Sequence, residues 1–400
     1  MSAFGKRVRA LREERGMTLT ALATAVPCDK GHLSRVETGR RPPTEALARR
    51  LDAVLGARGD LIGCAHLDAS ATRNTRPGET AELLRRIQAS DTAPATLEGL
   101  QAAVLELCCQ YGWRDAYELR AEGQTWLREL ARLLHRPVGL REHQELLVCG
   151  GWLALLVGCV EYDLGMRASA ETTRIAARQL GEEARHPGII GWAWELSAWF
   201  ALTQGRYPAV VAAARTGQTV APGESVGVQL IAQEAKARAR MGDLEGVRRT
   251  LDRGRVLLDA MPRPDRPDNH FVVDPDKWEF YEMDAYRLAG DDGLAEHHAR
   301  EVLRLGVRPD GGESSPMRMA EARLTLAAVA ARAGELEQAV ATGVVAFRAA
   351  RRSLPSLLMV AGEVDAELQR RYPREVATAQ FGEALRAVST PDAALRGEER

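Results

Sequence analysis

The sequence predicts an all-α protein in which a small N-terminal domain of five helices precedes a long α-solenoid. Its 400 residues exceed what one compact core usually organises, so two or more units are expected. Aromatic residues make up only 5% of the chain while Ala and Leu are abundant, which favours helix. Further along, a turn glycine recurs at spacings of 37 to 48 residues, which indicates repeated helical pairs.

The first helix is predicted to end at Gly16, a residue typical of the position just after a helix. Phe4, Val8 and Leu11 recur at helical spacing and form one narrow apolar stripe. The other faces of this helix carry basic residues. We therefore expect the stripe to face the core of the N-terminal domain.

Two short helices are predicted next, over residues 19–25 and 30–38, joined by about three residues. Thr18 is a suitable N-cap for the first of them, and Pro27 prevents its continuation. Asp29 is a suitable N-cap for the second. The signals at both ends of the short turn therefore agree.

A fourth and a fifth helix are expected to complete the domain. Thr44 caps the fourth helix and Gly56 ends it. One side of this helix carries Leu47, Leu51, Val54 and Leu55. The fifth helix is short, around residues 61–66, and the domain is expected to span residues 1–67, here called the head.

The head is basic and the rest of the chain is acidic. The head holds 12 Lys and Arg against 7 Asp and Glu, a charge of +5, and the remaining 42 basic and 48 acidic residues leave −6. This asymmetry predicts that any binding of a polyanion belongs to the head.

Two short helices joined by a short turn, inside a five-helix unit, have the geometry that lets the second helix enter the major groove of DNA. The segment from Gly16 to Gly39, GMTLTALATAVPCDKGHLSRVETG, resembles the phage-repressor-like (Xre-type) helix-turn-helix. The resemblance rests on three features of this segment. They are its start, the pair LA in its first helix, and LSR followed by an apolar residue and Glu in its second helix. The resemblance covers about 65 residues and implies that the head binds an operator in double-stranded DNA.

The resemblance also implies which residues contact DNA. Lys30, Gly31 and Arg35 match positions that read base edges in the family, and Arg35 is expected to pair with O6 and N7 of a guanine. Ser34 is expected to reach a phosphate, and the loop after Gly39 is expected to place backbone amides and two guanidinium groups along the phosphates. The expected DNA-contacting residues are Lys30, Gly31, His32, Ser34, Arg35, Arg40 and Arg41.

Some positions depart from the family pattern. Leu19 stands where the family often has a Gln that touches the DNA backbone, Pro27 replaces the usual turn glycine, and Gly31 offers no side chain to a base. We therefore expect both anchoring and base reading to be weaker than usual. Glu37 matches a near-constant acid of the family, and an internal ion pair with a basic residue of the head is favoured over DNA contact.

Residues 68–94 are expected to link the head to the solenoid. The run DASATRNTRPG in this segment is polar and rich in turn-forming residues, and one short helix is predicted around residues 79–89. The repeat region is expected over residues 95–388, followed by a polar tail over residues 389–400.

Within the repeat region, residues 192–222 resemble a tetratricopeptide repeat best, so the region is described as tetratricopeptide-like. One helical pair cannot cover its own apolar face, so neighbouring pairs stack and leave a concave surface lined by their first helices. An insertion over residues 261–276 explains the longest spacing. The predicted turn glycines are Gly165, Gly205, Gly242, Gly290 and Gly334.

Together, the head and this region resemble bacterial regulators in which an Xre-type head is controlled by tetratricopeptide-like repeats. The best-understood members bind a short signalling peptide in the concave groove and change their dimer geometry. The resemblance therefore implies a homodimer that binds an operator and responds to a peptide or small-molecule effector.

Several residues of the repeat region are candidates for an effector site. Trp192 and Trp199 share one helix face, the preceding repeat carries two further candidates, and a carboxylate lies nearby as a polar anchor. The candidate effector-binding residues are His143, Trp152, Trp192, Glu195 and Trp199. The alternative, which we favour, is that the tryptophans are ordinary packing residues of the repeats.

Histidines elsewhere in the repeat region are weaker candidates. His270 and Phe271 in the insertion fit either a mobile lid or a simple extension of the loop, and the second is favoured. His297 and His298 are adjacent, so on a helix they diverge by ~100° and cannot hold one metal. Both are expected at the surface.

Other classes of protein lack support in the sequence. The most apolar stretch, residues 146–160, is too short and too rich in Gly to span a bilayer, so a cytoplasmic protein without membrane contact is expected. The six cysteines form no CxxC pair and are expected to be buried thiols, with no metal and no cofactor. The motifs typical of hydrolases, metalloproteases and nucleotide-binding enzymes are absent, which argues against an enzyme.

Two functions remain. The favoured one is a homodimeric transcriptional regulator that binds an operator and is modulated through its repeats. The other is an interaction scaffold whose repeats hold a partner protein while DNA binding is weak or secondary. The small set of base-reading side chains around Gly31 keeps the second hypothesis open.

Overall fold

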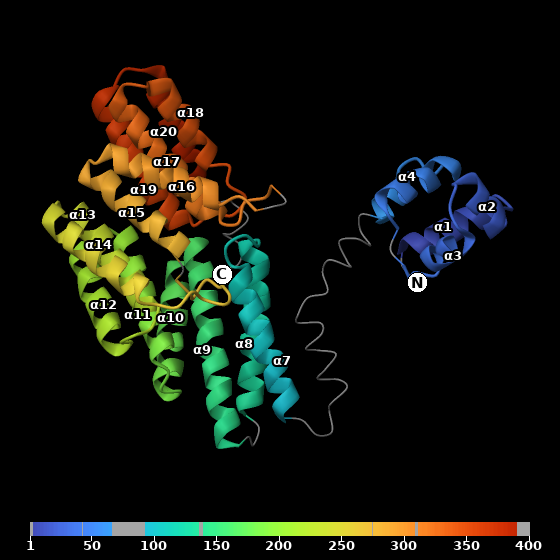
Figure 1. Ribbon diagram of the computed structural model, residues 1–400, viewed down its shortest axis with the longest axis horizontal. Coiled ribbons are helices and arrows are strands. Elements are labelled where there is room, and N and C mark those ends of the chain that lie inside the picture. The colour runs from blue at the N-terminus through green and yellow to red at the C-terminus, as the bar shows by residue number, and fades with distance from the viewer. Residues whose placement is uncertain are drawn as a thin grey trace. The chain divides into compact units, whose positions relative to one another are not determined.

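The computed structural model describes residues 3–41, 43–65, 93–135, 139–273, 275–308 and 311–389. The chain divides into two compact units, residues 1–89 and 90–400 (Figure 1). Every regular element in the described residues is a helix, which confirms the predicted all-α class. The predicted linker helix over residues 79–89 and the tail beyond residue 389 lie outside the described residues.

The head contains four named helices: α1 (Ala3–Glu14), α2 (Leu19–Ala25), α3 (Lys30–Glu37) and α4 (Glu45–Val54). Residues 60–65 form a further short helix. The predicted apolar stripes meet in one core, and its fully buried members include Phe4, Val8, Leu22, Leu33, Val36, Leu51, Leu55 and Leu61. The helices that the local patterns predicted are therefore those that pack together.

Side chains cap the three helices that follow α1. The Thr18 hydroxyl accepts a hydrogen bond from the Ala21 amide at 3.1 Å, and the Asp29 carboxylate accepts one from the His32 amide at 2.8 Å. Thr44 caps α4 in the same way. All three predicted N-caps are confirmed, and each satisfies an amide that the helix itself cannot pair.

The second unit is an array of helices. Their bounds are α7 (Ala93–Gln110), α8 (Ala116–Leu134), α9 (Leu140–Asp163), α10 (Arg167–Glu183), α11 (Pro187–Thr203), α12 (Tyr207–Val220), α13 (Val226–Arg240), α14 (Leu244–Asp259), α15 (Pro275–Ala289), α16 (Asp292–Leu305), α17 (Pro316–Ala333), α18 (Leu336–Ala346), α19 (Leu354–Arg371) and α20 (Val376–Ser389). From α8 to α18, each helix packs on the next. This nearest-neighbour packing is what a repeat architecture requires.

The five predicted turn glycines each occupy the left-handed backbone region between two helices. Their φ angles lie between 72° and 93°, where a side chain would be strained. The glycines are Gly165, Gly205, Gly242, Gly290 and Gly334. The turns predicted from spacing are thus confirmed.

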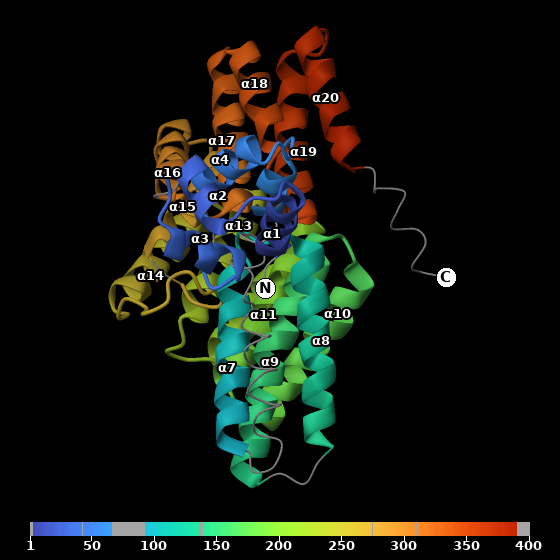
Figure 2. The ribbon, with the colours of Figure 1, turned by 90° about the vertical axis from the view of Figure 1, so that its right-hand side faces the viewer.

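The first helix of each pair faces the inside of the array. The helices α9, α11, α13, α15, α17 and α19 contact one another in series, and α19 also returns to contact α9 and α11 (Figures 1 and 2). The array therefore curls until its last pair of helices meets its first ones. The sequence pattern predicted the stacking of the helices but not this closure.

Helix α9 is longer and more apolar than the sequence pattern indicated. It has 24 residues and is apolar enough to cross a membrane by length and composition, but 78% of its most apolar window is buried inside the array. Gly151 in this helix contributes to that packing, because a Cβ there would lie 2.8 Å from the Ile189 side chain. We interpret α9 as the central core helix of the array.

Four of the six cysteines are buried, and Cys28 and Cys64 are half-buried. Burial raises the pKa of Cys109 and of Cys149 to about 12, which keeps both as thiols. The expectation of buried thiols is therefore correct for four cysteines and incorrect for the two in the head.

Candidate nucleic-acid interface and central cavity

Helix α3 presents one buried side and one open side. Leu33 and Val36 have no exposed surface and fix the helix against the core of the head. The side chains of Lys30 and Arg35 are exposed, and His32 and Ser34 are half-buried. The residues predicted to contact DNA therefore lie on the solvent side of a helix that has its own N-cap and a buried apolar side.

Among the described residues, the cations on and just after α3 have no acidic partner, whereas several others in the head do. Lys30, Arg35, Arg40 and Arg41 have no acidic partner among the described residues. By contrast, Arg7, Arg9, Arg12 and Arg49 each form an ion pair within the head. An exposed cation without an acidic partner breaks no ion pair when it binds a phosphate, so this end of α3 is suited to bind a polyanion.

Gly31 lies beneath the side chain of Arg35. A Cβ built on Gly31 would lie 3.8 Å from an Arg35 terminal nitrogen and 3.2 Å from the Asp29 carboxylate. The guanidinium group therefore passes close above the bare backbone of the helix. The missing side chain removes one possible base contact, and a Cβ at this position would make only ordinary contact with Arg35.

The loop after α3 differs from the expectation in one respect. The amides of Arg40 and Arg41 both donate to the Arg35 carbonyl, at 2.8 and 3.1 Å, and the Gly39 amide donates to Val36. These donors close the end of the helix and are not free for phosphates. The expected contact of phosphates with backbone amides is therefore wrong for this loop, and only the two exposed guanidinium groups remain for that role.

Glu37 forms the predicted internal ion pair. Its carboxylate accepts from Arg12 Nε at 2.7 Å and from a terminal Arg12 nitrogen at 3.2 Å, and the residue is only 6% exposed. The hydrogen bond that Arg12 donates to this carboxylate raises the pKa of its guanidinium group. Arg12 also donates to the Met17 carbonyl at 3.0 Å, so the pair joins α1, α3 and the turn before α2.

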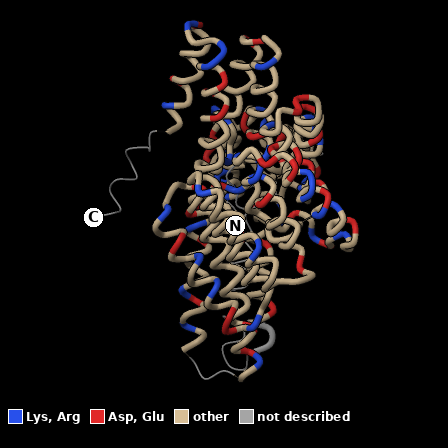
Figure 3. Tube along the Cα trace, turned by 90° about the vertical axis from the view of Figure 1, so that its left-hand side faces the viewer, with Lys and Arg blue, Asp and Glu red and all other residues tan. Residues whose placement is uncertain are grey.

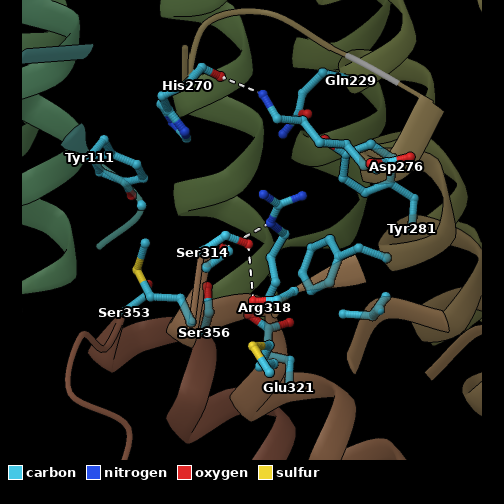
Figure 4. Close-up of a pocket in the computed structure, with 18 of the residues that line it drawn as sticks. Tyr111, Gln229, His270, Asp276, Tyr281, Ser314, Arg318, Glu321, Ser353 and Ser356 are labelled. Atoms are coloured by element: carbon cyan, nitrogen blue, oxygen red, sulfur yellow. Dashed lines mark hydrogen bonds between the residues drawn. The ribbon is translucent and has the colours of Figure 1, made fainter. Parts of the chain in front are cut away.

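The array encloses a cavity of about 420 Å³ (Figure 4). Its lining comes from the first helices α11, α13, α15, α17 and α19, together with the end of α7, the end of α16 and the loop around residue 268. This volume falls in the range of small-molecule sites. The inner surface that the repeat pattern predicted is therefore partly enclosed rather than an open groove.

The five residues predicted for an effector do not form one site. Glu195 and Trp199 line the cavity, whereas His143, Trp152 and Trp192 do not. Trp192 is 2% exposed and packs against His270 and Phe271, as expected for a core residue. The tryptophans of this region thus divide between core packing and cavity lining.

Part of the insertion over residues 261–276 packs against the array. Phe271 is buried against Trp152 and Trp192, with ring centroids 5.5 and 5.3 Å apart. The His270 amide donates to the Cys108 carbonyl at 3.1 Å, and its ring lies 3.8 Å from that of Tyr111. Burial lowers the pKa of His270 well below its usual range, so its ring is neutral. Residues 269–273 therefore pack against the array, whereas most of residues 262–268 are exposed, which agrees with an extension of the loop better than with a mobile lid.

Charged groups are buried on the inner side of the cavity. Glu195 accepts from Gln229 at 3.1 Å and from Gln233 at 2.6 Å, and its burial raises its pKa. Lys236 lies over the ring of Phe280 at 4.3 Å. These groups are costly to bury without a polar counterpart. Sequence reasoning found Glu195 but missed Lys236.

Glu321 is the other buried acid of this lining. It is 7% exposed and has no hydrogen-bond partner among the described residues. Burial raises the pKa of Glu321 to about 7, while the nearby Lys236 opposes the shift. Its carboxyl group therefore exchanges between the protonated and the charged form near neutral pH.

A group with metal-ligand chemistry lies on α15 and α16. Oxygen atoms of Glu279 and Glu282 and a ring nitrogen of His298 lie within 4.8 Å of one another. Glu282 already forms a close ion pair with Arg255, and His298 Nδ1 lies 2.6 Å from Glu279. We therefore interpret the group as an ion-pair network. His298 was expected at the surface but is buried, while His297 is exposed as predicted.

Residues 3–62 match a family model described as a helix-turn-helix domain. The match covers the head and none of the array. No curated protein matches the chain. The chain therefore carries an N-terminal helix-turn-helix domain, which supports DNA binding, joined to a helical array.

Proposed function

We propose that this protein is a transcriptional regulator of the Xre type, which binds an operator in double-stranded DNA as a homodimer. The observation that carries the proposal is the row of unpaired cations on and after α3, within a matched helix-turn-helix domain. Lys30 and Arg35 face the base edges, and Arg40 and Arg41 lie along the phosphates. His32 lies with Lys30 at the end of α3 that faces the groove, and Ser34 reaches a phosphate.

A dimer follows from the small reading surface. In a single head only two side chains and one glycine read bases, so one head discriminates poorly between DNA sequences. A dimer that binds two half-sites multiplies this discrimination. The array is distinct in charge from the head. Figure 3 shows its acidic and basic residues interspersed on the side in view, so no basic stripe there suggests a second DNA contact.

We assign the array a regulatory role, as a tetratricopeptide-like module that holds an effector. Its cavity is enclosed by several helices, and its volume of about 420 Å³ favours a small molecule over a peptide. An effector that binds one arrangement of the helices better than another shifts the population towards that arrangement. This role requires binding alone, so we propose a cytoplasmic regulator without catalytic activity and without a metal or cofactor.

The proposal predicts that Arg35→Ala weakens binding to the operator by about 1–3 kcal/mol per contact and leaves non-specific binding unchanged. The reason is that Arg35 reads a base, whereas the phosphate contacts do not depend on sequence. The measurement is a titration of the full-length protein with the DNA beside its own gene and with unrelated DNA, at several salt concentrations. For the wild type, log affinity is expected to fall linearly with log salt.

Arg49→Ala is the matched control, because Arg49 is an exposed arginine of the head that lies on α4 and is paired with Glu45. It is expected to bind both DNAs like the wild type. If the wild type binds only weakly, without preference and regardless of Arg35, the regulator proposal fails. Capture of a partner protein by the array would then support the scaffold hypothesis.

A further inference from the structure

Arg318 places an unmatched positive charge in the middle of the cavity. It lies in the first turn of α17 and lines the cavity, and its guanidinium group points into the open space on the side of His270 (Figure 4). Its Nε donates to the Ser315 hydroxyl at 2.8 Å, which fixes the direction of the side chain. In the part of the chain that the structure describes, its two terminal nitrogens have neither a hydrogen-bond nor an ion-pair partner.

The other basic groups of the lining have partners. Lys277 donates to the carbonyls of Asn269 and His270, at 3.1 and 3.2 Å, and to that of Val272. Lys236 lies 4.0 Å from Asp284 and over an aromatic ring. A free arginine fork in a partly enclosed space is therefore the group of this cavity that most needs an anion.

The neighbouring groups limit the charge of that anion. The acids Glu195, Asp268, Asp276 and Glu321 line the same cavity, and its lysines Lys236 and Lys277 already have partners, so a second negative charge on the ligand would be repelled. A carboxylate has one charge and two coplanar oxygens, which match the two terminal nitrogens of the fork. A phosphate ester with two charges fits less well.

The remaining walls suit an apolar body. They include aromatic and aliphatic side chains from four helices, namely Trp199, Leu202, Phe280, Val302, Leu305 and Met359. A ligand held by one charged contact and a largely apolar surface is typical of small-molecule sites. Glu321, half-protonated near neutral pH because burial raises its pKa to about 7, is available to a hydroxyl or amino group of the ligand.

We propose that the effector of this protein is a small organic acid with one carboxylate, held by the Arg318 fork with its apolar body against α11, α15, α16 and α19. This inference deepens the proposed function, since it names the ligand class of the regulatory array. The site itself is tested without DNA.

The test uses 4-bromobenzoate as the probe and its neutral analogue 4-bromobenzamide as the ligand control, with the full-length protein. Calorimetric titration is expected to show saturable binding of the carboxylate and binding of the amide that is at least about tenfold weaker. Arg318→Gln is expected to weaken binding of the carboxylate by about tenfold to a hundredfold, because a charged hydrogen-bonded pair is lost. It should leave binding of the amide unchanged.

Two further variants separate the role of the fork from a change in fold. Arg318→Lys keeps the charge without the fork, so an intermediate affinity is expected. Arg300→Gln removes an exposed arginine of α16 outside the cavity and should bind like the wild type. In crystals soaked with the probe, the anomalous signal of bromine should lie in the cavity with the carboxylate on Arg318.

The proposal is overturned if the carboxylate and the amide bind equally, if Arg318→Gln binds like the wild type, if bromine lies elsewhere, or if no saturable binding occurs. Failure here with intact operator binding rejects the ligand class and leaves the regulator. Carboxylate binding in a protein that does not bind DNA keeps the site and rejects the regulator.

Discussion

Replacing Arg351 with Met is expected to destabilise the array by about 3–5 kcal/mol, because it leaves a buried carboxylate without its counterion. The Arg351 side chain lies 2.7 Å from Asp163, and the two side chains are 2% and 0% exposed. The Tyr111 hydroxyl donates to the same carboxylate oxygen at 2.7 Å. Burial raises the pKa of Asp163, and Arg351 lowers it, so loss of the arginine leaves the carboxylate with the full cost of burial.

The consequence reaches beyond one ion pair. Asp163 ends α9 and Arg351 lies just before α19, and 188 positions separate them in sequence. Together with Tyr111 they hold the last pair of helices against the first ones. The loss of Arg351 is therefore expected to open the closed form of the array as well as to lower its stability.

Denaturant unfolding of the full-length protein, followed by circular dichroism, measures the change. Arg352→Met is the matched control, since Arg352 is the exposed neighbour and donates only to a backbone carbonyl. It is expected to unfold at the midpoint of the wild type. Equal midpoints for the two variants would show that the buried pair does not stabilise the array.

The second large effect is expected from Gly5→Ala in α1. A Cβ at this position would lie 2.4 Å from the Glu37 carbonyl oxygen and 2.8 Å from that of Val36. Both are backbone atoms, so a side chain cannot move aside, and α1 must separate from the end of α3. Overpacking of this kind costs about 1–3 kcal/mol, and we expect the upper end of that range.

Hydrogen exchange measures this effect within the full-length protein. The amides of α1 and α3 are expected to exchange faster in the variant, and operator binding should weaken in parallel because α3 loses its support. Gly63→Ala is the control, because its Cβ would meet nothing within 4 Å and Gly63 lies in the short helix over residues 60–65. That substitution should leave exchange unchanged or slightly slower. Unchanged exchange in Gly5→Ala would contradict the tight contact between α1 and α3.

The head was predictable because its signals are local. Thr18, Asp29 and Thr44 each cap a helix three residues before the amide that they bind, and this spacing is visible in the sequence. The apolar stripe of Phe4 and Val8 is equally local. The hydrogen bonds from the amides of the following loop to the Arg35 carbonyl could not be predicted from the sequence, because the path of the chain after a helix is not set by residue type alone.

The array was predictable as a succession of helices but not as a closed body. Its turn glycines repeat in the sequence, whereas the Asp163–Arg351 pair depends on the summed rotation of all the helical pairs between them. The cavity results from the same closure, so its lining has no local pattern. One feature of the sequence is related to this lining. The chain holds only four lysines, and two of them, Lys236 and Lys277, line the cavity.

Selection of DNA from a random-sequence pool by the full-length protein tests operator binding most directly. A homodimeric regulator should enrich a two-fold symmetric site whose half-sites lie about 10–10.5 base pairs apart, or a multiple of that distance, since each half-site receives one α3. Enrichment of a guanine in each half-site should disappear in Arg35→Ala. A pool that remains random after repeated selection, or a site whose enrichment does not depend on Arg35, would contradict the assignment of this protein as a sequence-specific regulator.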